Sequence, residues 1–174
     1  MSGVTLLWII ALPLVGLAVP FVLGRYSRPA AAVGAFLPTA LALGLLLSLA
    51  PQVFGGETLL ATWAWVPTFG LDISLRLDGL GFFFAFLILA IGLLVVTYAH
   101  FYLAEDDPPG RFFASLLLFM GSMLGVVLSE NLLLMVVFWE MTSISSFLLI
   151  GYWYHRTVAS EGARMALAVT GAGG

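Results

Sequence analysis

The sequence predicts an all-α integral membrane protein, in which five transmembrane helices and the start of a sixth accompany a short outer β-hairpin. Composition is the first reason, since 62% of the 174 residues are hydrophobic and 9% are charged. An ordinary soluble domain has about 25% charged residues, and a soluble chain this apolar could not cover its surface with polar groups. The second reason is that the apolar residues gather in runs of roughly 20, enough for a helix to cross a hydrocarbon core about 30 Å thick.

Five runs are long enough to span, and they set the predicted division of the chain. They are Val4–Leu23, Ala30–Ala50, Leu80–His100, Phe112–Leu128 and Leu132–Tyr154. A sixth begins near Ala163 and is too short to span. The first is expected to be a retained helix, because no basic residue precedes it as in a signal peptide. We therefore expect helices one and two in residues 1–50, an outer hairpin loop in 51–77, and helices three to five with the start of helix six in 78–174.

Charge and cysteine content exclude several functions. The net charge is −3, with six arginines and no lysine, so the chain lacks the broad basic face that binds nucleic acid. There is no cysteine, which excludes disulfides, thiolate metal sites and cysteine nucleophiles. The two histidines, His100 and His155, lie too far apart in the sequence to suggest a metal site. We expect no cofactor.

The arginines predict the orientation. Five of the six fall in linkers on one side of the membrane: Arg25, Arg28, Arg111, Arg156 and Arg164. Arg76 alone falls on the other side. The positive-inside rule then puts the five-arginine side in the cytoplasm and the N-terminus outside. The acidic segment Glu105–Gly110 falls on the cytoplasmic side, but acidic residues count little in that rule.

The outer linker carries a strand pattern. Leu71–Asp78 ("LDISLRLD") alternates apolar and polar residues, which is typical of a half-buried strand. The preceding "TWAWV" and the turn residues Pro67–Gly70 complete a predicted hairpin on the outer surface. Trp63 and Trp65 are expected near the lipid headgroups.

Glu140 is the candidate functional residue. It lies nine positions after Asn131, where helix five enters, and thus roughly 13 Å into the membrane. No other acid or base lies that deep in the five predicted spans. A charge there costs about 2.5–3.5 kcal/mol on insertion scales. Two interpretations stay open: a structural carboxylate hydrogen-bonded to another helix, or a proton relay. We favour the relay, because intramembrane ionisable groups are functional by default.

The surroundings of Glu140 are mostly apolar. Ser143 shares its helical face, whereas Thr142 and its neighbouring serines point elsewhere. Such hydroxyls bond back to a carbonyl one turn earlier and allow a neighbouring helix to approach, so helix five is expected inside a bundle. The "GSMLG" segment Gly121–Gly125 has the small-xxx-small spacing of close helix contacts.

Other polar residues receive smaller roles. Asp78 is predicted to cap helix three, and Ser129, Glu130 and Asn131 to cap helix five. His100, at the cytoplasmic boundary, is expected to be an interfacial anchor; a weaker alternative is proton uptake, because imidazole titrates near neutral pH. Arg164 is assigned to topology.

The segment from Arg111 to Arg156, with "FWEMTSISSFLLIGYW" at its end, and the following "EGARMALAVTGAGG" resemble the antiporter-like subunit family. That family includes the large subunits of Mrp-type multisubunit Na⁺/H⁺ antiporters and the proton-pumping membrane subunits of complex I. The resemblance extends back to "LDGL" at Leu77–Leu80. Within the family the chain is similar to the branch formed by the A subunits of Mrp antiporters. Complex I relatives tend to have Gly before the Trp-Glu pair, where this chain has Phe138, and "VGLCSYLLIGFW" after it.

The resemblance implies a larger machine. It implies a fold of about fourteen helices, with two inverted repeats that each contain a broken helix. The family's helix-five Glu, matched by Glu140, pairs with a Lys on helix seven. This chain has no Lys and stops in helix six, so it resembles an N-terminal fragment, and the partner would lie beyond Gly174.

Three functions follow as expectations. The first is a transport subunit, not an enzyme, in a bacterial inner membrane, which exchanges cytoplasmic Na⁺ for H⁺ with other Mrp subunits and membrane lipid as partners. The second is a proton-pumping subunit of a complex I-type dehydrogenase or a hydrogenase-like relative. The third is a scaffold in which Glu140 is structural.

Overall fold

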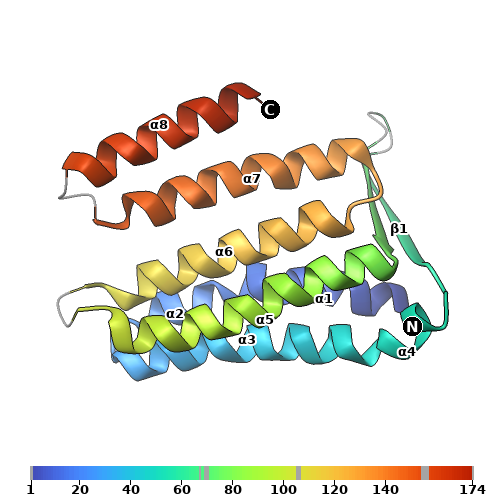
Figure 1. Cartoon of the computed structure of the whole chain (residues 1–174), viewed down its shortest axis with the longest axis horizontal. Helices are drawn as coiled ribbons and strands as arrows, with labels where there is room; N and C mark the ends of the chain where they lie inside the picture. Colours follow the sequence, from blue (N-terminus) through green and yellow to red (C-terminus); the bar gives the residue numbers. More distant parts are fainter. Residues whose placement is uncertain (1, 67, 69–70, 105–106, 154–156, 174) are drawn as a thin grey trace.

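The computed structural model is a bundle of long helices with a two-stranded hairpin at one end (Figure 1). It describes residues 2–66, 68, 71–104, 107–153 and 157–173. The elements in chain order are α1 (Ser2–Gly16), α2 (Ala18–Leu23), α3 (Arg28–Ser48), α4 (Ala50–Phe54), β1 (Leu59–Val66), β2 (Leu71–Leu77), α5 (Gly79–Tyr102), α6 (Pro109–Leu128), α7 (Leu132–Ile150), the 3-10 turn η2 (Gly151–Trp153) and α8 (Thr157–Gly173).

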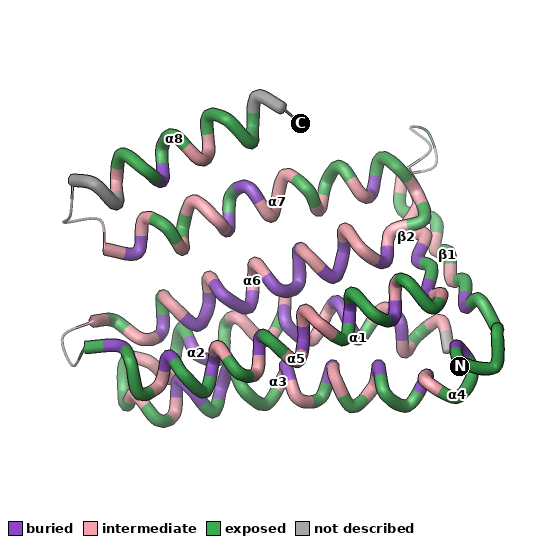
Figure 2. The backbone as a smooth tube through the Cα atoms, viewed as in Figure 1, coloured by how far each residue is buried: buried purple, intermediate pink, exposed green. Residues whose placement is uncertain are grey.

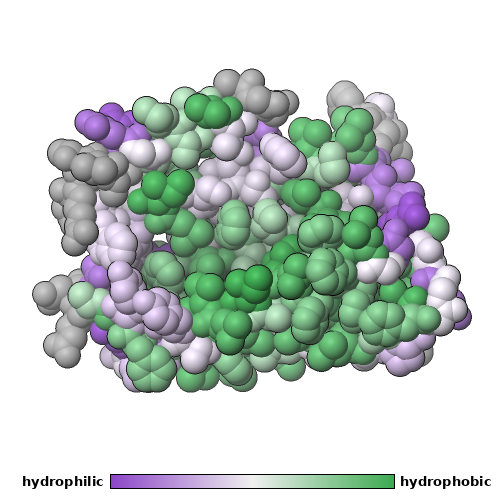
Figure 3. Space-filling view, in the orientation of Figure 1, coloured by the Kyte–Doolittle hydropathy of each residue, from purple (hydrophilic) through white to green (hydrophobic). Residues whose placement is uncertain are grey.

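The prediction of five membrane-spanning helices is confirmed. The described residues contain five helical stretches long and apolar enough to span: Gly3–Leu23, Arg28–Phe54, Gly79–Tyr102, Pro109–Leu128 and Leu132–Trp153. Figure 3 shows the matching surface, with hydrophobic side chains over the middle of the helices and hydrophilic ones toward both ends. A surface that exposes this much apolar area in one band is that of a lipid-facing protein.

Two predicted helix boundaries were wrong. The second span continues through α4 to Phe54 instead of ending at Ala50, because Pro51 occupies the first turn of α4, where its missing N–H costs nothing. The glycine pair that follows then ends the helix, with Gly56 at φ 89°. At the other end, α8 begins at Thr157, not near Ala163. Its first turns are helical although they are too polar to be part of an apolar membrane span.

Helix α6 is the centre of the bundle. It packs against α1, α2, α3, α5 and α7, and Figure 2 shows its buried positions along its whole length. Half of its most apolar stretch is buried, against 17% of that of α7. Gly121 and Gly125 permit two of these contacts, because a methyl group at Gly121 would overlap Leu14 of α1 and one at Gly125 the ring of Phe138 of α7. The predicted close-packing role of "GSMLG" is confirmed.

Helix α7 lies between α6 and α8 (Figure 1). Many of its large apolar side chains are exposed, among them Leu132, Leu133, Trp139 and Ile144. Among the described residues, α7 is therefore a boundary helix, and the expectation that it lies inside a bundle is not met by this part of the chain.

The predicted hairpin is confirmed in its two strands. β1 and β2 pair antiparallel, with Leu59 opposite Leu77 and Trp63 opposite Ile73. Most of the predicted turn, Pro67–Gly70, lies outside the described residues. The alternation of β2 works as expected, since Leu75 and Leu77 are buried in the core.

The hairpin is attached to the start of α7. Leu75 forms a bridge with Ser129, and the Glu130 N–H donates to the Ser74 carbonyl at 2.9 Å. Arg76 adds ion pairs to Asp78 at 3.3 Å and Glu130 at 3.5 Å. The loop that the sequence places on the outer surface therefore determines where α7 enters the bundle.

Candidate functional site

Helix α7, which carries Glu140, begins with a side-chain cap. The Asn131 carboxamide accepts a hydrogen bond from the Leu133 N–H at 2.8 Å, as predicted. Ser129 and Glu130 do not cap α7: the Ser129 hydroxyl donates to the Gly125 carbonyl at 2.6 Å, and Glu130 pairs with Arg76. From Leu132 to Ile150 the helix contains no proline or glycine, so it continues unbroken past Glu140.

Glu140 is the ninth residue of α7 and lies near the middle of its length. At about 1.5 Å per residue it is roughly 12 Å from the start of the helix. Its side chain is half-buried, and its Oε1 atom is fully buried without a hydrogen-bond partner in the part of the chain that the structure describes. A buried carboxylate oxygen without a donor costs free energy, so this position calls for a proton, a cation or water.

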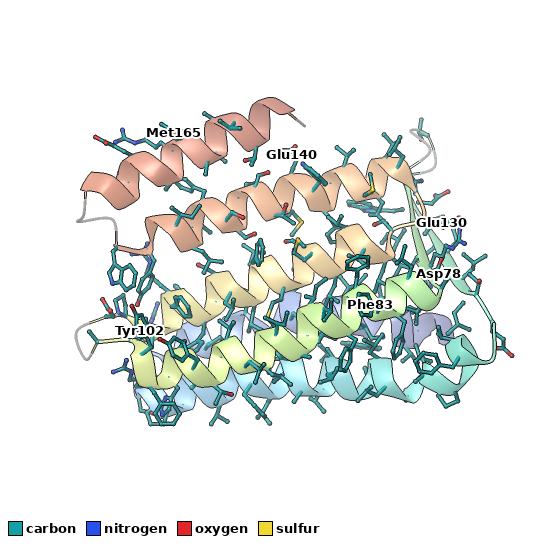
Figure 4. All side chains as sticks on the ribbon, in the orientation of Figure 1. Asp78, Phe83, Tyr102, Glu130, Glu140 and Met165 are labelled. Carbon is teal, nitrogen blue, oxygen red and sulfur yellow. The ribbon has the colours of Figure 1, made fainter. Side chains whose placement is uncertain are left out.

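The two sides of α7 have different neighbours. Phe138 packs on Gly125 of α6, and Leu134 belongs to the same core. Glu140 lies on the other side, toward α8, as Figure 4 shows. Ile150, the last residue of α7, also faces α8, because a Cβ on Gly162 would lie 4.0 Å from its side chain. The carboxylate is therefore directed to the α7–α8 boundary and not into the α6 core.

Helix α8 does not supply a cation to Glu140 within the described residues. Its basic residue, Arg164, is the eighth of the seventeen residues of α8 and is exposed, and its Nε donates to the Ser160 carbonyl one turn earlier at 3.3 Å. Figure 4 places Glu140 beside the opposite, C-terminal half of α8.

The hydroxyls near Glu140 bond to their own helix. Thr142 donates to the Trp139 carbonyl at 2.6 Å, and Ser143, which is buried, lies 3.5 Å from the same oxygen. Ser145 donates to the Met141 carbonyl at 2.9 Å. These are the predicted bonds to the preceding turn. These hydroxyl protons are therefore used within α7.

His100 lies elsewhere in the bundle. It is in the last turn of α5, half-buried, and lines a cavity between α3 and α5 with Phe36 and Val96. Its Nδ1 is buried without a hydrogen-bond partner among the described groups. Helix α6 separates α5 from α7 (Figure 1), so the structure does not bring His100 and Glu140 together. His155 and Arg156 lie outside the described residues.

The arginine-rich linkers meet at one end of the bundle, as the topology requires. Gly24 and Gly110 touch, which brings the Arg25 and Arg111 linkers together, and Tyr152 at the end of α7 donates to the Pro108 carbonyl at 3.2 Å. No sequence pattern indicated this last contact, because its partners are 44 positions apart. Among the described residues no three His, Asp or Glu side chains lie close enough to hold a metal ion.

Two family models match the chain. The family of the N-terminus of NADH-ubiquinone oxidoreductase (complex I) chain 5 matches residues 63–113, and the NADH:quinone oxidoreductase/Mrp antiporter transmembrane family matches residues 129–174. The A/B subunit of a probable K⁺/H⁺ antiporter of Rhizobium meliloti is 60% identical over 124 residues. The chain is therefore similar to the antiporter-like subunit family. The A1 subunit of a Na⁺/H⁺ antiporter of Staphylococcus aureus is 47% identical over 129 residues.

Solved structures agree with this similarity. The Mrp complex from Dietzia sp. DQ12-45-1b contains a chain that matches 97% of this one with a TM-score of 0.79 and 30% identity. A chain of the membrane-bound sulfane sulfur reductase, an archaeal respiratory membrane complex, matches 82% with a TM-score of 0.69; at 24% identity it shows the fold alone. The resemblance of the sequence to the antiporter-like family, and within it to the A subunits, is confirmed.

The match covers a small part of each relative. The alignment with the Rhizobium protein covers 71% of this chain but 12% of that protein. The alignment with the Staphylococcus protein covers 74% of this chain but 16% of that protein, and the structural match covers 18% of the Dietzia chain. The two family models leave residues 114–128 of α6 between them. Glu140 lies within the second.

Proposed function

We propose that this chain is the N-terminal part of a subunit of a multisubunit antiporter that exchanges cytoplasmic Na⁺ for H⁺, driven by the proton-motive force. Glu140 is the intramembrane carboxylate that takes up and releases a proton. The observation that carries this role is the buried Glu140 Oε1, in mid-helix, without a hydrogen-bond partner among the described residues. A purely structural carboxylate at such depth would be expected to have a donor on it.

The partners and location follow from the same proposal. The other subunits of an Mrp-type complex would cover the exposed faces of the bundle. The bilayer would be a bacterial inner membrane, with the arginine-rich end in the cytoplasm and the N-terminus outside. Thr142 and Ser143 support the relay by packing, since their hydroxyls are bonded to their own helix. His100 is kept as a weak site of proton uptake.

The transported cation is open to direct test, because the two relatives differ in the ion they are named for, K⁺ in one and Na⁺ in the other. We propose Na⁺. The complete complex is placed in inverted vesicles, a pH gradient is formed, and its collapse on addition of NaCl or KCl is followed with a pH-sensitive dye. Na⁺ is expected to collapse the gradient; a response to KCl alone would contradict the choice of Na⁺.

The role of Glu140 is tested in the same vesicles. Glu140→Gln keeps the size of the side chain and removes its titration, so exchange should fall to the level of vesicles without the complex. Glu57→Gln, the same change at an exposed position after α4, is the matched control and should exchange like the native complex. Normal exchange by the Glu140→Gln complex would show that the carboxylate is structural.

A second candidate is a proton-pumping subunit of a complex I-type dehydrogenase. It is favoured by the family model that matches residues 63–113, which is named for complex I chain 5. Purification of the complex through this chain distinguishes the two. Flavin and iron–sulfur absorbance with NADH-dependent quinone reduction would support the dehydrogenase, and a colourless complex with cation-dependent exchange would support the antiporter.

A further inference from the structure

The arginine-rich end of the bundle contains a close crossing of two helices. Gly24, just after α2, and Gly110, in the first turn of α6, lie against each other: a methyl group on Gly24 would come within 2.6 Å of the Gly110 Cα. Two backbones this close cannot accept side chains between them. The residue after each glycine is an arginine, Arg25 or Arg111, so the crossing places two like charges on adjacent segments.

A groove begins beside this crossing. It has a volume of about 250 Å³ and is lined by Leu17, Phe21, Arg111, Ala114, Ser115, Leu118 and Leu148. These residues come from the α1–α2 segment, from α6 and from α7. Arg25 also reaches its wall, since its guanidinium carbon lies 5.5 Å from the centre of the Phe21 ring. Both arginines are exposed.

The two walls share one polarity gradient. On α6, Arg111, Ser115 and Leu118 follow at spacings of four and three, which places them on one face of the helix. On the other wall Arg25, Phe21 and Leu17 follow at spacings of four. Each wall begins with a guanidinium at the end of the bundle and becomes apolar toward the middle of the membrane. The groove thus offers positive charge at headgroup level and a hydrocarbon surface below it.

We propose that this groove binds one anionic phospholipid, with its phosphate between Arg25 and Arg111 and an acyl chain against Phe21, Leu17 and Leu118. Charge complementarity favours the anion, because the crossing puts two arginines on touching segments and a phosphate accepts hydrogen bonds from guanidinium groups. Arg111 also interacts with other groups of this chain, and its five N–H donors are enough for both tasks. The apolar walls favour a lipid over free phosphate.

The proposal is tested on the complete complex after removal of lipid in detergent. Phosphatidylglycerol and phosphatidylcholine with the same acyl chains are titrated separately, and bound lipid is counted by native mass spectrometry. The native complex should retain phosphatidylglycerol in preference. The double variant Arg25→Gln/Arg111→Gln should bind one molecule fewer, or bind it about twenty-fivefold more weakly, at about fivefold per arginine. If the double variant does not assemble, Arg25→Gln alone should show the fivefold loss.

Matched variants separate the charge from the groove. Arg164→Gln removes an exposed arginine of α8 outside the groove and should leave the affinity unchanged. Ser115→Phe fills the groove while both arginines remain, and should also abolish the preferred site. Equal binding of the two lipids, an equal loss in the Arg164→Gln complex, unchanged binding after Ser115→Phe, or displacement by millimolar inorganic phosphate would each overturn the proposal. Native-like retention by the double variant would also overturn it, and would show that the lipid is held elsewhere in the complex.

Discussion

Asp107 accepts hydrogen bonds from the Trp153 Nε1 through both of its carboxylate oxygens, at 3.1 and 3.2 Å. The residues are 46 positions apart, one in the turn between α5 and α6 and the other in η2 at the end of α7. In the same turn, the Pro108 carbonyl accepts a hydrogen bond from the Tyr152 hydroxyl. The end of α7 is therefore held by the Asp107 carboxylate and the Pro108 carbonyl of the turn before α6, at the opposite end of the bundle from the hairpin that anchors its start.

Loss of this contact should destabilise the packing of α7. Trp153→Phe removes the indole N–H and leaves a charged acceptor without that donor, which costs about 1.5–3 kcal/mol for a hydrogen bond to a charged group. Asp107→Asn keeps one acceptor oxygen and should lower the free energy of unfolding by less. Thermal unfolding of the purified complex measures both. Trp8→Phe, at an indole that is 49% exposed on α1, is the control and should shift the melting temperature least.

The contact of Gly125 with Phe138 predicts an unusual response to alanine. Alanine normally stabilises a helix over glycine by about 1 kcal/mol. Gly125→Ala should instead destabilise the protein by about 1–3 kcal/mol, because its methyl group overlaps the Phe138 ring. Gly44→Ala on α3 meets nothing within 4 Å and should be neutral or stabilising. The two variants are compared by thermal unfolding in the same detergent, and a Gly125→Ala protein as stable as the Gly44→Ala protein would contradict the packing described.

Asp78 has two roles that substitution can separate. Its Oδ1 accepts from the Gly81 N–H at 2.8 Å, which confirms the predicted cap of α5, and its Oδ2 pairs with Arg76. Asp78→Asn keeps the cap and loses the ion pair, while Asp78→Ala loses both. We expect a cost of about 1 kcal/mol for loss of the cap and well below that for the half-exposed ion pair. Arg76→Gln loses the ion pairs to both Asp78 and Glu130, so its melting temperature should differ from that of the native protein somewhat more than that of Asp78→Asn does, and added salt should reduce both differences.

Glu140→Gln should separate stability from transport. The native carboxylate places a buried oxygen without a hydrogen-bond partner among the described residues, so replacement by a neutral amide of the same size should leave the melting temperature of the complex unchanged or raise it. Cation-driven proton exchange should be lost in the same preparation. A marked fall in melting temperature would point to a stabilising ion pair in the intact complex.

The sequence by itself determined the features that depend on neighbouring residues. The five spans follow from runs of apolar residues, the depth of Glu140 from helical rise, and the hairpin strands from their alternation. The caps at Asp78 and Asn131 were predictable for the same reason, because a cap joins groups two or three positions apart. The errors at Phe54 and Thr157 came at helix ends, where hydropathy is a poor guide to where a backbone stops being helical.

Only the tertiary structure decided which faces meet. Helix periodicity predicts the residues that share a face with Glu140, but nothing local says that this face turns toward α8 while Phe138 turns toward α6. The crossing of Gly24 with Gly110 and the bond from Trp153 to Asp107 join residues 86 and 46 positions apart. Inside a membrane both sides of a helix are apolar, so hydropathy no longer marks the inner side. Close packing of small residues and a few long-range hydrogen bonds choose it instead.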